Sequence, residues 1–147
     1  MKFYALFATA FAALALVAVM AGCSPMPSTG TEEPVNLDGT SWTLIRLQDQ
    51  DPIADTQATL AFEGDQVSGT ASCNRYFGSV TLKDDTLTFG AIGSTEMWCA
   101  TPEGVMDQEA DYLKALGAAA RYNVENDQLT LLDASGQALL VFGAGTD

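Results

Sequence analysis

The chain has 147 residues, 48% of them hydrophobic, and its 19 acidic and 6 basic side chains give a formal net charge of −13 at pH 7. Nucleic acid and anionic lipid surfaces require clustered Lys and Arg to neutralise phosphate, so this balance argues against both as partners. Histidine is absent, which excludes Ser-His-Asp and Cys-His catalysis and removes the commonest metal ligand. We therefore expect no metal and no other cofactor.

Residues 1–22 are typical of an export signal. Lys2 precedes an apolar run over residues 3–19 without formal charge, and the small residues Ala21 and Gly22 follow it. The run also approaches the ~20 residues that a membrane-spanning helix needs, so an uncleaved N-terminal anchor is the alternative.

Cys23 stands directly after this signal, where bacterial lipoproteins are cleaved and lipidated. Met20 occupies a position that is more often Leu in such sites. Two or more acyl chains give stable membrane attachment, so we expect the lipid on Cys23 to hold the mature chain on a membrane of the cell envelope. Position 24 is Ser and not the Asp that retains lipoproteins in the inner membrane. This predicts an outer-membrane protein facing the periplasm if the source has two membranes.

Residues 23–35 are rich in Pro, Ser, Thr and Glu and contain too little apolar surface to order themselves. We expect a flexible tether there. A single domain of roughly 110 residues remains, with predicted bounds 36–143.

From Thr40 onward, apolar and polar residues alternate as they do in half-buried strands. Turn residues interrupt the alternation at short intervals, and Asn, Asp and Gly accept the positive φ that tight hairpins need. The expected turns are Gly64-Asp65, Asp84-Asp85, Asn126-Asp127 and Ala134-Ser135-Gly136. Strands joined in this way predict an antiparallel meander.

One segment breaks the alternation and predicts a helix over residues 102–116. Thr101 suits the N-cap, Pro102 the first helical position and Gly117 the C-terminal stop. We expect the helix to cover one face or mouth of the sheet. Its predicted core-facing residues are Val105, Met106, Tyr112, Leu113 and Leu116.

The acidic residues are scattered, which favours a solvated surface over a cation site. Asp84 and Asp85 are the nominal carboxylate pair for an enzyme, but the tip of a hairpin is too solvated to shift their pKa values usefully. We expect no catalytic residues and no enzyme.

Cys73 and Cys99 remain once Cys23 is assigned to lipid. An exported chain meets an oxidising compartment, so an even remainder predicts one disulfide between them. Two buried free thiols are the alternative. No Cys-x-x-Cys spacing accompanies them, which argues against redox exchange and against zinc.

Four blocks of the sequence resemble the META (HslJ-like) domain family over residues from about 36 to 143. They are Leu37 to Trp42, Val67 to Gly78, Ser94 to Cys99 and the closing pair Leu131 to Asp133 with Leu139 to Phe142. Family members often carry Ala or Thr where this chain has Trp98. The resemblance implies a small α+β domain with a strongly curved, barrel-like antiparallel sheet and one helix, in an envelope or secreted setting with a stress association.

The second and third blocks contain a candidate binding patch. Asn74, Arg75, Tyr76 and Trp98 combine polar and aromatic side chains suited to a ligand or partner. The structural alternative assigns Asn74 to a turn that bonds its own backbone. Trp42 is expected to fill the core.

These observations lead to one functional hypothesis and one alternative. We expect a lipid-anchored, non-enzymatic envelope protein that supports stress tolerance by binding an envelope protein or a small apolar ligand. The alternative is an inhibitor of a cationic hydrolase such as lysozyme, because small acidic lipoproteins with a disulfide can act in that way.

Overall fold

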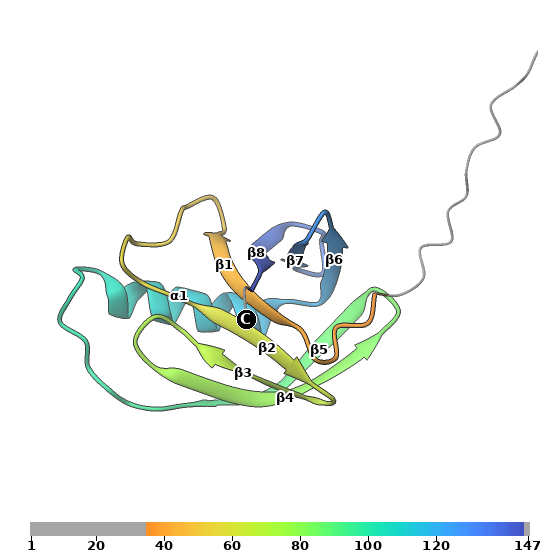
Figure 1. The fold of residues 1–147 in the computed structure, drawn as a ribbon, viewed down its shortest axis with the longest axis horizontal. Coiled ribbons are helices and arrows are strands. Elements are labelled where there is room, and N and C mark those ends of the chain that lie inside the picture. The colour runs from red at the N-terminus through yellow and green to blue at the C-terminus, as the bar shows by residue number, and fades with distance from the viewer. Residues whose placement is uncertain (1–34, 146–147) are drawn as a thin grey trace, which may run out of the picture. The chain divides into compact units, whose positions relative to one another are not determined.

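The computed structural model describes residues 35–145, which form eight strands and one helix (Figure 1). In chain order these are β1 (Ser41–Leu47), β2 (Thr59–Glu63), β3 (Gln66–Thr70), β4 (Arg75–Lys83), β5 (Thr86–Ser94), α1 (Val105–Ala118), β6 (Arg121–Glu125), β7 (Gln128–Leu132) and β8 (Ala138–Ala144). The predicted export signal, the lipidation site at Cys23 and nearly all of the 23–35 tether lie outside the described residues, so they remain predictions.

Each strand pairs antiparallel with the next, and β8 returns to pair with β1, which closes the sheet into a barrel. Register shifts of the kind that β-bulges produce interrupt the β1–β8, β4–β5 and β7–β8 ladders. Such bulges bend strands and increase their twist, as a small barrel requires. The predicted α+β fold with a strongly curved antiparallel meander is therefore confirmed.

Each predicted hairpin turn contains at least one residue with left-handed backbone. Gly64 joins β2 to β3 with φ of 60°, and Asp84 joins β4 to β5 with φ of 54°. Asn126 and Asp127 both have positive φ, 49° and 60°, between β6 and β7. Gly136 has φ of 90° between β7 and β8. These short connections set the order of the strands around the barrel.

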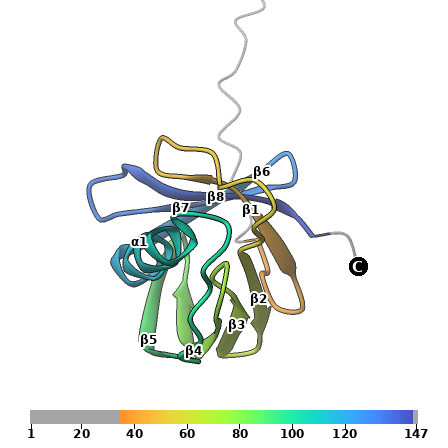
Figure 2. The ribbon, with the colours of Figure 1, turned by 90° about the vertical axis from the view of Figure 1, so that its left-hand side faces the viewer.

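The ladder between β5 and β6 is the shortest in the barrel, because only Thr86 and Arg121 form a register pair. Backbone bonds from Leu87 to Ala120 and from Tyr122 to Asp85 flank that pair. Past this pair, α1 runs antiparallel to β5 and packs against β5 and β8 (Figure 2). The helix thus lies where the two strands no longer pair.

The helix begins later than predicted, at Val105 and not at residue 102. Gly104 is the N-cap, with a left-handed φ of 82° and no side-chain cap bond, so the predicted cap at Thr101 is wrong. A left-handed residue cannot continue a right-handed helix, and this fixes the boundary. The helix also extends past Gly117 to Ala118, and the N–H of Ala119 donates back to the carbonyl of Leu116.

The core lies inside the barrel and along one face of α1. Of the predicted helix stripe, Val105, Tyr112 and Leu116 are buried, whereas Met106 and Leu113 are half-buried. The strands contribute most of the remaining buried apolar side chains, which include Leu44, Leu60, Phe62, Val67, Tyr76, Val80, Leu87, Leu129, Leu131, Leu140 and Phe142.

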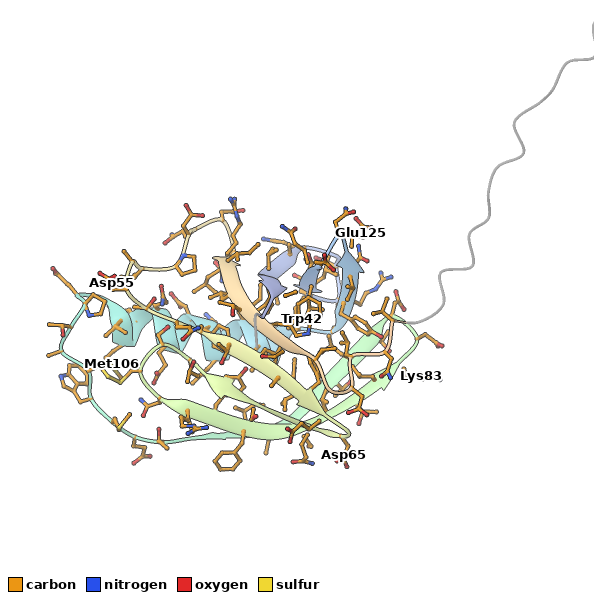
Figure 3. All side chains as sticks on the ribbon, viewed as in Figure 1. Trp42, Asp55, Asp65, Lys83, Met106 and Glu125 are labelled. Carbon is orange, nitrogen blue, oxygen red and sulfur yellow. A yellow bond between two sulfur atoms is a disulfide. The ribbon has the colours of Figure 1, made fainter. Side chains whose placement is uncertain are left out.

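Trp42 is buried as expected, and its Nε1–H donates to Oγ1 of Thr40 at 2.8 Å (Figure 3). Gly69 on β3 has no room for a side chain. A Cβ on Gly69 would lie 2.0 Å from the carbonyl oxygen of Thr59, so a side chain there would force β2 and β3 apart. The part of the chain from residue 35 to 145 contains no helix with the length and apolarity to cross a bilayer.

Candidate functional site

A disulfide joins the turn before β4 to the segment that leads from β5 towards α1. The sulfur atoms of Cys73 and Cys99 are bonded, and their Cα atoms are 6.0 Å apart at a sequence separation of 26. The predicted bridge is confirmed, and two free thiols are excluded. The loop that it closes contains all of β4 and β5.

Asn74, next to this disulfide, is buried, and its side chain makes all four hydrogen bonds that an amide can form. Its Nδ2 donates to the carbonyl of Met97 at 3.0 Å and to Oε1 of Glu109 at 2.7 Å. Its Oδ1 accepts from the N–H of Met97 and from the hydroxyl of Thr95, both at 2.7 Å. One amide therefore holds the segment after β5 and the helix together.

Glu109 supplies the other half of this arrangement from α1, with only 6% of its surface exposed. Its Oε2 accepts from the backbone N–H groups of Cys73 at 3.1 Å and Asn74 at 2.6 Å. The two ion pairs found between residues 35 and 145 involve other carboxylates. Burying a carboxylate requires hydrogen-bond donors, and the turn before β4 provides them.

Gln108 makes a second set of polar contacts from the same turn of α1. Its Nε2 donates to the hydroxyls of Thr56 at 2.8 Å and Ser72 at 2.7 Å, and its Oε1 accepts from the N–H of Ile53 at 2.6 Å. We call Asn74, Gln108 and Glu109 the polar hub. The hub fixes three irregular segments to one helix.

Three large apolar side chains are exposed at the end of the barrel that the polar hub organises. Trp98 is 80% exposed, Phe77 63% and Met97 56%. Phe77 lies opposite Gly93 in the β4–β5 ladder, and a Cβ built on Gly93 would lie 3.1–3.7 Å from its ring atoms. We call Phe77, Met97 and Trp98 the aromatic end.

The backbone on both sides of Trp98 is fixed. Met97 is bonded through its N–H and its carbonyl to Asn74, and Cys99 is held by the disulfide. The indole is therefore presented to solvent from a segment that is already ordered. Presentation of this kind reduces the entropy lost when a surface binds a partner.

The structure does not bring the four residues of the predicted patch together on one surface. Asn74 is 2% exposed and Tyr76 is 1% exposed, whereas Arg75 and Trp98 are exposed. The alternation of β4 directs Tyr76 into the barrel, and Asn74 is satisfied by the segment after β5 and by α1. Asn74 and Tyr76 are thus buried supports for an exposed surface to which Arg75 and Trp98 contribute.

Tyr76 and Tyr112 form a buried pair across the barrel interior. Their hydroxyl oxygens are 2.8 Å apart, and both hydroxyls contact the carbonyl oxygen of Thr59. Burial raises the pKa of Tyr76 far above its usual range, although the hydrogen bond with Tyr112 partly offsets this. Burial, reinforced by Tyr76, also raises the pKa of Tyr112 well above its usual value. Both phenols are neutral at physiological pH and serve the packing of the interior.

The largest fully buried side chains belong to this interior. The ring of Tyr112 lies 5.7 Å from that of Tyr76 and 6.3 Å from that of Phe142, centroid to centroid. Phe62 and several leucines are also fully buried. An apolar ligand inside the barrel would have to displace these groups, so the exposed aromatic end is the better candidate for contact with a ligand or partner.

The carboxylate pair considered for catalysis lies in the turn between β4 and β5. Asp85 is exposed and accepts from Nε of Arg121 at 3.1 Å and from Nη2 of the same guanidinium. This hydrogen bond holds the pKa of Asp85 below its usual range, whereas a general acid needs a raised pKa. The described residues also contain no group of three Cys, Asp or Glu side chains placed to hold a metal ion.

Sequence reasoning missed Gln108 and Glu109 of the hub and Phe77 and Met97 of the exposed surface. Glu109 offered a signal, because it lies on the same helical face as Val105, Tyr112 and Leu116. A charged residue within an apolar stripe indicates a buried polar partner.

Comparisons with known proteins agree with the architecture. The family model of the META domain matches residues 35–146. No match was found among proteins with curated descriptions.

Solved structures share the fold. A protein from Burkholderia xenovorans solved by NMR has 33% sequence identity and a TM-score of 0.62, with 84% of this chain and 98% of that chain covered. A second NMR structure has 25% identity and a TM-score of 0.59, with 73% and 90% covered. A crystal structure of a DUF4847 family protein from Bacteroides vulgatus has 12% identity and a TM-score of 0.55, with 76% and 96% covered, and shares the fold alone.

Proposed function

The chain belongs to the META domain family, and we propose that it is a lipid-anchored, non-enzymatic binding protein of the cell envelope. In this proposal the lipid on Cys23 holds the domain at a membrane, and the aromatic end contacts a protein partner. The contact supports the tolerance of the envelope to stress.

One observation carries the proposal: Trp98 is 80% exposed on a backbone that a disulfide and a saturated buried amide both fix. Trp is among the residues that contribute most binding energy in protein interfaces. Keeping a large apolar side chain in water provides no folding stability, so its rigid presentation favours a role in recognition.

Complementation of cells that lack the gene tests this proposal. We expect wild-type protein to restore growth under envelope stress, and the Met97→Ala, Trp98→Ala double variant to fail although it accumulates to the same level. Truncating these exposed side chains removes little packing, so the thermal midpoint should be close to that of wild type. Ile45→Ala is the matched control, because Ile45 is also a large exposed apolar residue, on β1.

Full complementation by the double variant would refute a role for the aromatic end. Photocrosslinking from position 98 of the full lipidated chain gives a second measurement, and we expect a crosslink to protein and not to lipid. A Cys23→Ser variant should lose both membrane attachment and complementation.

A second candidate is an inhibitor of a cationic hydrolase, and the acidic surface favours it. With a formal net charge of −13, the chain is suited to steer a basic enzyme to its surface. Titration against lysozyme tests this directly: loss of lytic activity that returns on charge reversal of exposed acids would support it, and unchanged lysis would remove it.

A further inference from the structure

We infer that the partner of the aromatic end is a protein with a cationic surface around an apolar pocket, which docks at the end of the barrel opposite the point where the described chain starts. This inference rests on the proposed function and specifies the chemistry of its partner. Two features of the described residues carry it: the place where the preceding chain joins the barrel, and the charges around Trp98.

The chain outside the structure joins the barrel at the end opposite Trp98. Asp38, near the start of the described chain, accepts from the N–H of Gly64 in the β2–β3 turn. β3 runs from that turn to Thr70, near Cys73 and the disulfide. Figure 1 shows the described chain starting beside the β4–β5 turn, while the segment from β5 to α1 lies at the other side.

The lengths of β3 and β4 set the distance between these two ends of the barrel. β3 has five residues and β4 nine, and a rise of about 3.3 Å per residue makes these strands roughly 17 and 30 Å long. The start of the described chain near Asp38 is therefore about one strand length away from the aromatic end.

The charges around Trp98 indicate what such a protein must present. Glu96, Glu103 and Asp107 are exposed on the connecting segment and on the first turn of α1. A cation, Arg75, also lies beside this segment. Its N–H donates to Oγ1 of Thr95, and its carbonyl accepts from the N–H of Thr95.

A second segment adds to this negative charge. Gln108 bonds the backbone of Ile53, so the neighbouring exposed carboxylate of Asp55 is held near the start of the helix (Figure 3). Asp55 and Met106, the second residue of α1, lie at the same side of the domain in that view. Exposed carboxylates thus lie on both sides of Met97 and Trp98 along the chain and beside the start of α1.

These charges and apolar side chains indicate the surface that a complementary partner would have. An apolar pocket on the partner would take Trp98 and Met97 as anchors, and Lys or Arg around it would pair with Glu96 and Glu103. An acidic partner would be repelled, because like charges brought together at an interface are unfavourable.

Photocrosslinking in isolated envelopes tests the inference with the full lipidated chain, carrying p-benzoylphenylalanine at position 98. We expect a crosslinked protein whose yield falls about tenfold when Glu96→Lys and Glu103→Lys are combined, and falls as NaCl rises from 0.05 to 0.5 M. The matched control combines Glu63→Lys and Asp65→Lys. It makes the same change in net charge at the β2–β3 turn, on exposed residues, and should leave the yield unchanged.

Each outcome of this experiment tests the cationic partner, the proposed function or both. A protein crosslink that persists in the Glu96→Lys, Glu103→Lys variant overturns the cationic partner and leaves the proposed function standing. An equal loss in the control variant also overturns the inference, because net charge would then suffice. Crosslinks to lipid alone, or none, overturn both proposals. Circular dichroism of both variants confirms that they are folded.

Discussion

At one end of the barrel the chain turns through residues that shape their own backbone, whereas at the other end segments far apart in sequence hold one another. In the β4–β5 turn, Asp84 has a positive φ and Thr86 bonds Lys83 locally, and the bonds that reach the turn from Tyr122 and Arg121 come from β6, which pairs with β5 there. The end that carries Trp98 depends on the polar hub and a disulfide, and Asn74 and Glu109 are separated by 35 residues. We call the first of these the turn end; the second carries the aromatic end. Local turns set the topology, while the long-range polar contacts create an ordered surface.

The largest expected effect is that of removing Asn74. Asn74→Ala leaves the buried carboxylate of Glu109 and both backbone groups of Met97 without their amide partner. Unsatisfied buried polar and charged groups cost several kcal/mol, so we expect the free energy of unfolding to fall by about 3–5 kcal/mol. Urea denaturation followed by tryptophan fluorescence measures it.

Asn123→Ala is the matched control for this change. Asn123 also donates to a glutamate, Glu125, at 2.9 Å, but both residues are exposed on β6. A change within about 0.5 kcal/mol is expected there. If the two variants lost similar stability, the aromatic end would not depend on the polar hub.

Removal of the disulfide should have the next largest effect. For the Cys73→Ser, Cys99→Ser double variant, the chain-entropy relation predicts a loss of about 3.5 kcal/mol at a sequence separation of 26. The amide of Met97 should nevertheless remain protected in hydrogen exchange, because Asn74 still accepts its N–H. Rapid exchange of that amide in the double variant would show that the disulfide alone orders the segment.

The sequence predicted most of what is local and little of what is long-range. The hairpin turns could be located because Asn, Asp and Gly set their own φ at Gly64, Asp84, Asn126 and Gly136. The disulfide followed from the number of cysteines in an exported chain. The helix start was placed too early, because Thr101 and Pro102 favour a helix N-terminus and nothing in the sequence fixed Gly104 in a left-handed conformation.

The candidate site was harder to predict because its parts are joined only in three dimensions. Asn74 and Trp98 were identified, but the interpretation of Asn74 as part of a surface failed because its bonding partners lie 21–35 residues away. Glu109 lies in the apolar stripe of the helix, but the sequence does not show which distant groups its carboxylate bonds. Strands around a filled interior and around a cavity also show the same alternation, so only packing reveals the buried pair of Tyr76 and Tyr112.

Alkaline pH should act on the barrel interior, between the two ends. The pKa values of Tyr76 and Tyr112 are raised by burial above the value of about 10 expected in the unfolded chain. The unfolded state therefore loses protons first, so the contribution of each tyrosine is complete below pH 10 and is lost as pH rises towards the folded pKa. We expect stability at pH 11 to fall by about 1.4 kcal/mol for each tyrosine relative to pH 9.

Urea titrations at both pH values measure this loss, and Tyr76→Phe supplies the comparison. Phenylalanine keeps the ring but removes one ionisable hydroxyl, so the decrease between pH 9 and pH 11 should be smaller than that of wild type by about 1.4 kcal/mol. An equal decrease in the variant would assign the alkaline effect to groups outside the buried pair.

The smallest effect is expected at the turn end, where Arg121 bonds Asp85 in full contact with solvent. Exposed ion pairs contribute little because water and salt screen them. Arg121→Ala should therefore leave the urea midpoint at pH 7 close to that of wild type, although the pKa of Asp85 should rise towards its usual value once the guanidinium is gone. Because the pair lowers that pKa, any contribution to stability is present above about pH 4 and disappears as pH falls through the folded pKa. NMR titration of the Asp85 carboxyl measures its pKa independently of the urea midpoint. A large drop in the midpoint would mean that the turn end, like the aromatic end, depends on a contact between distant residues.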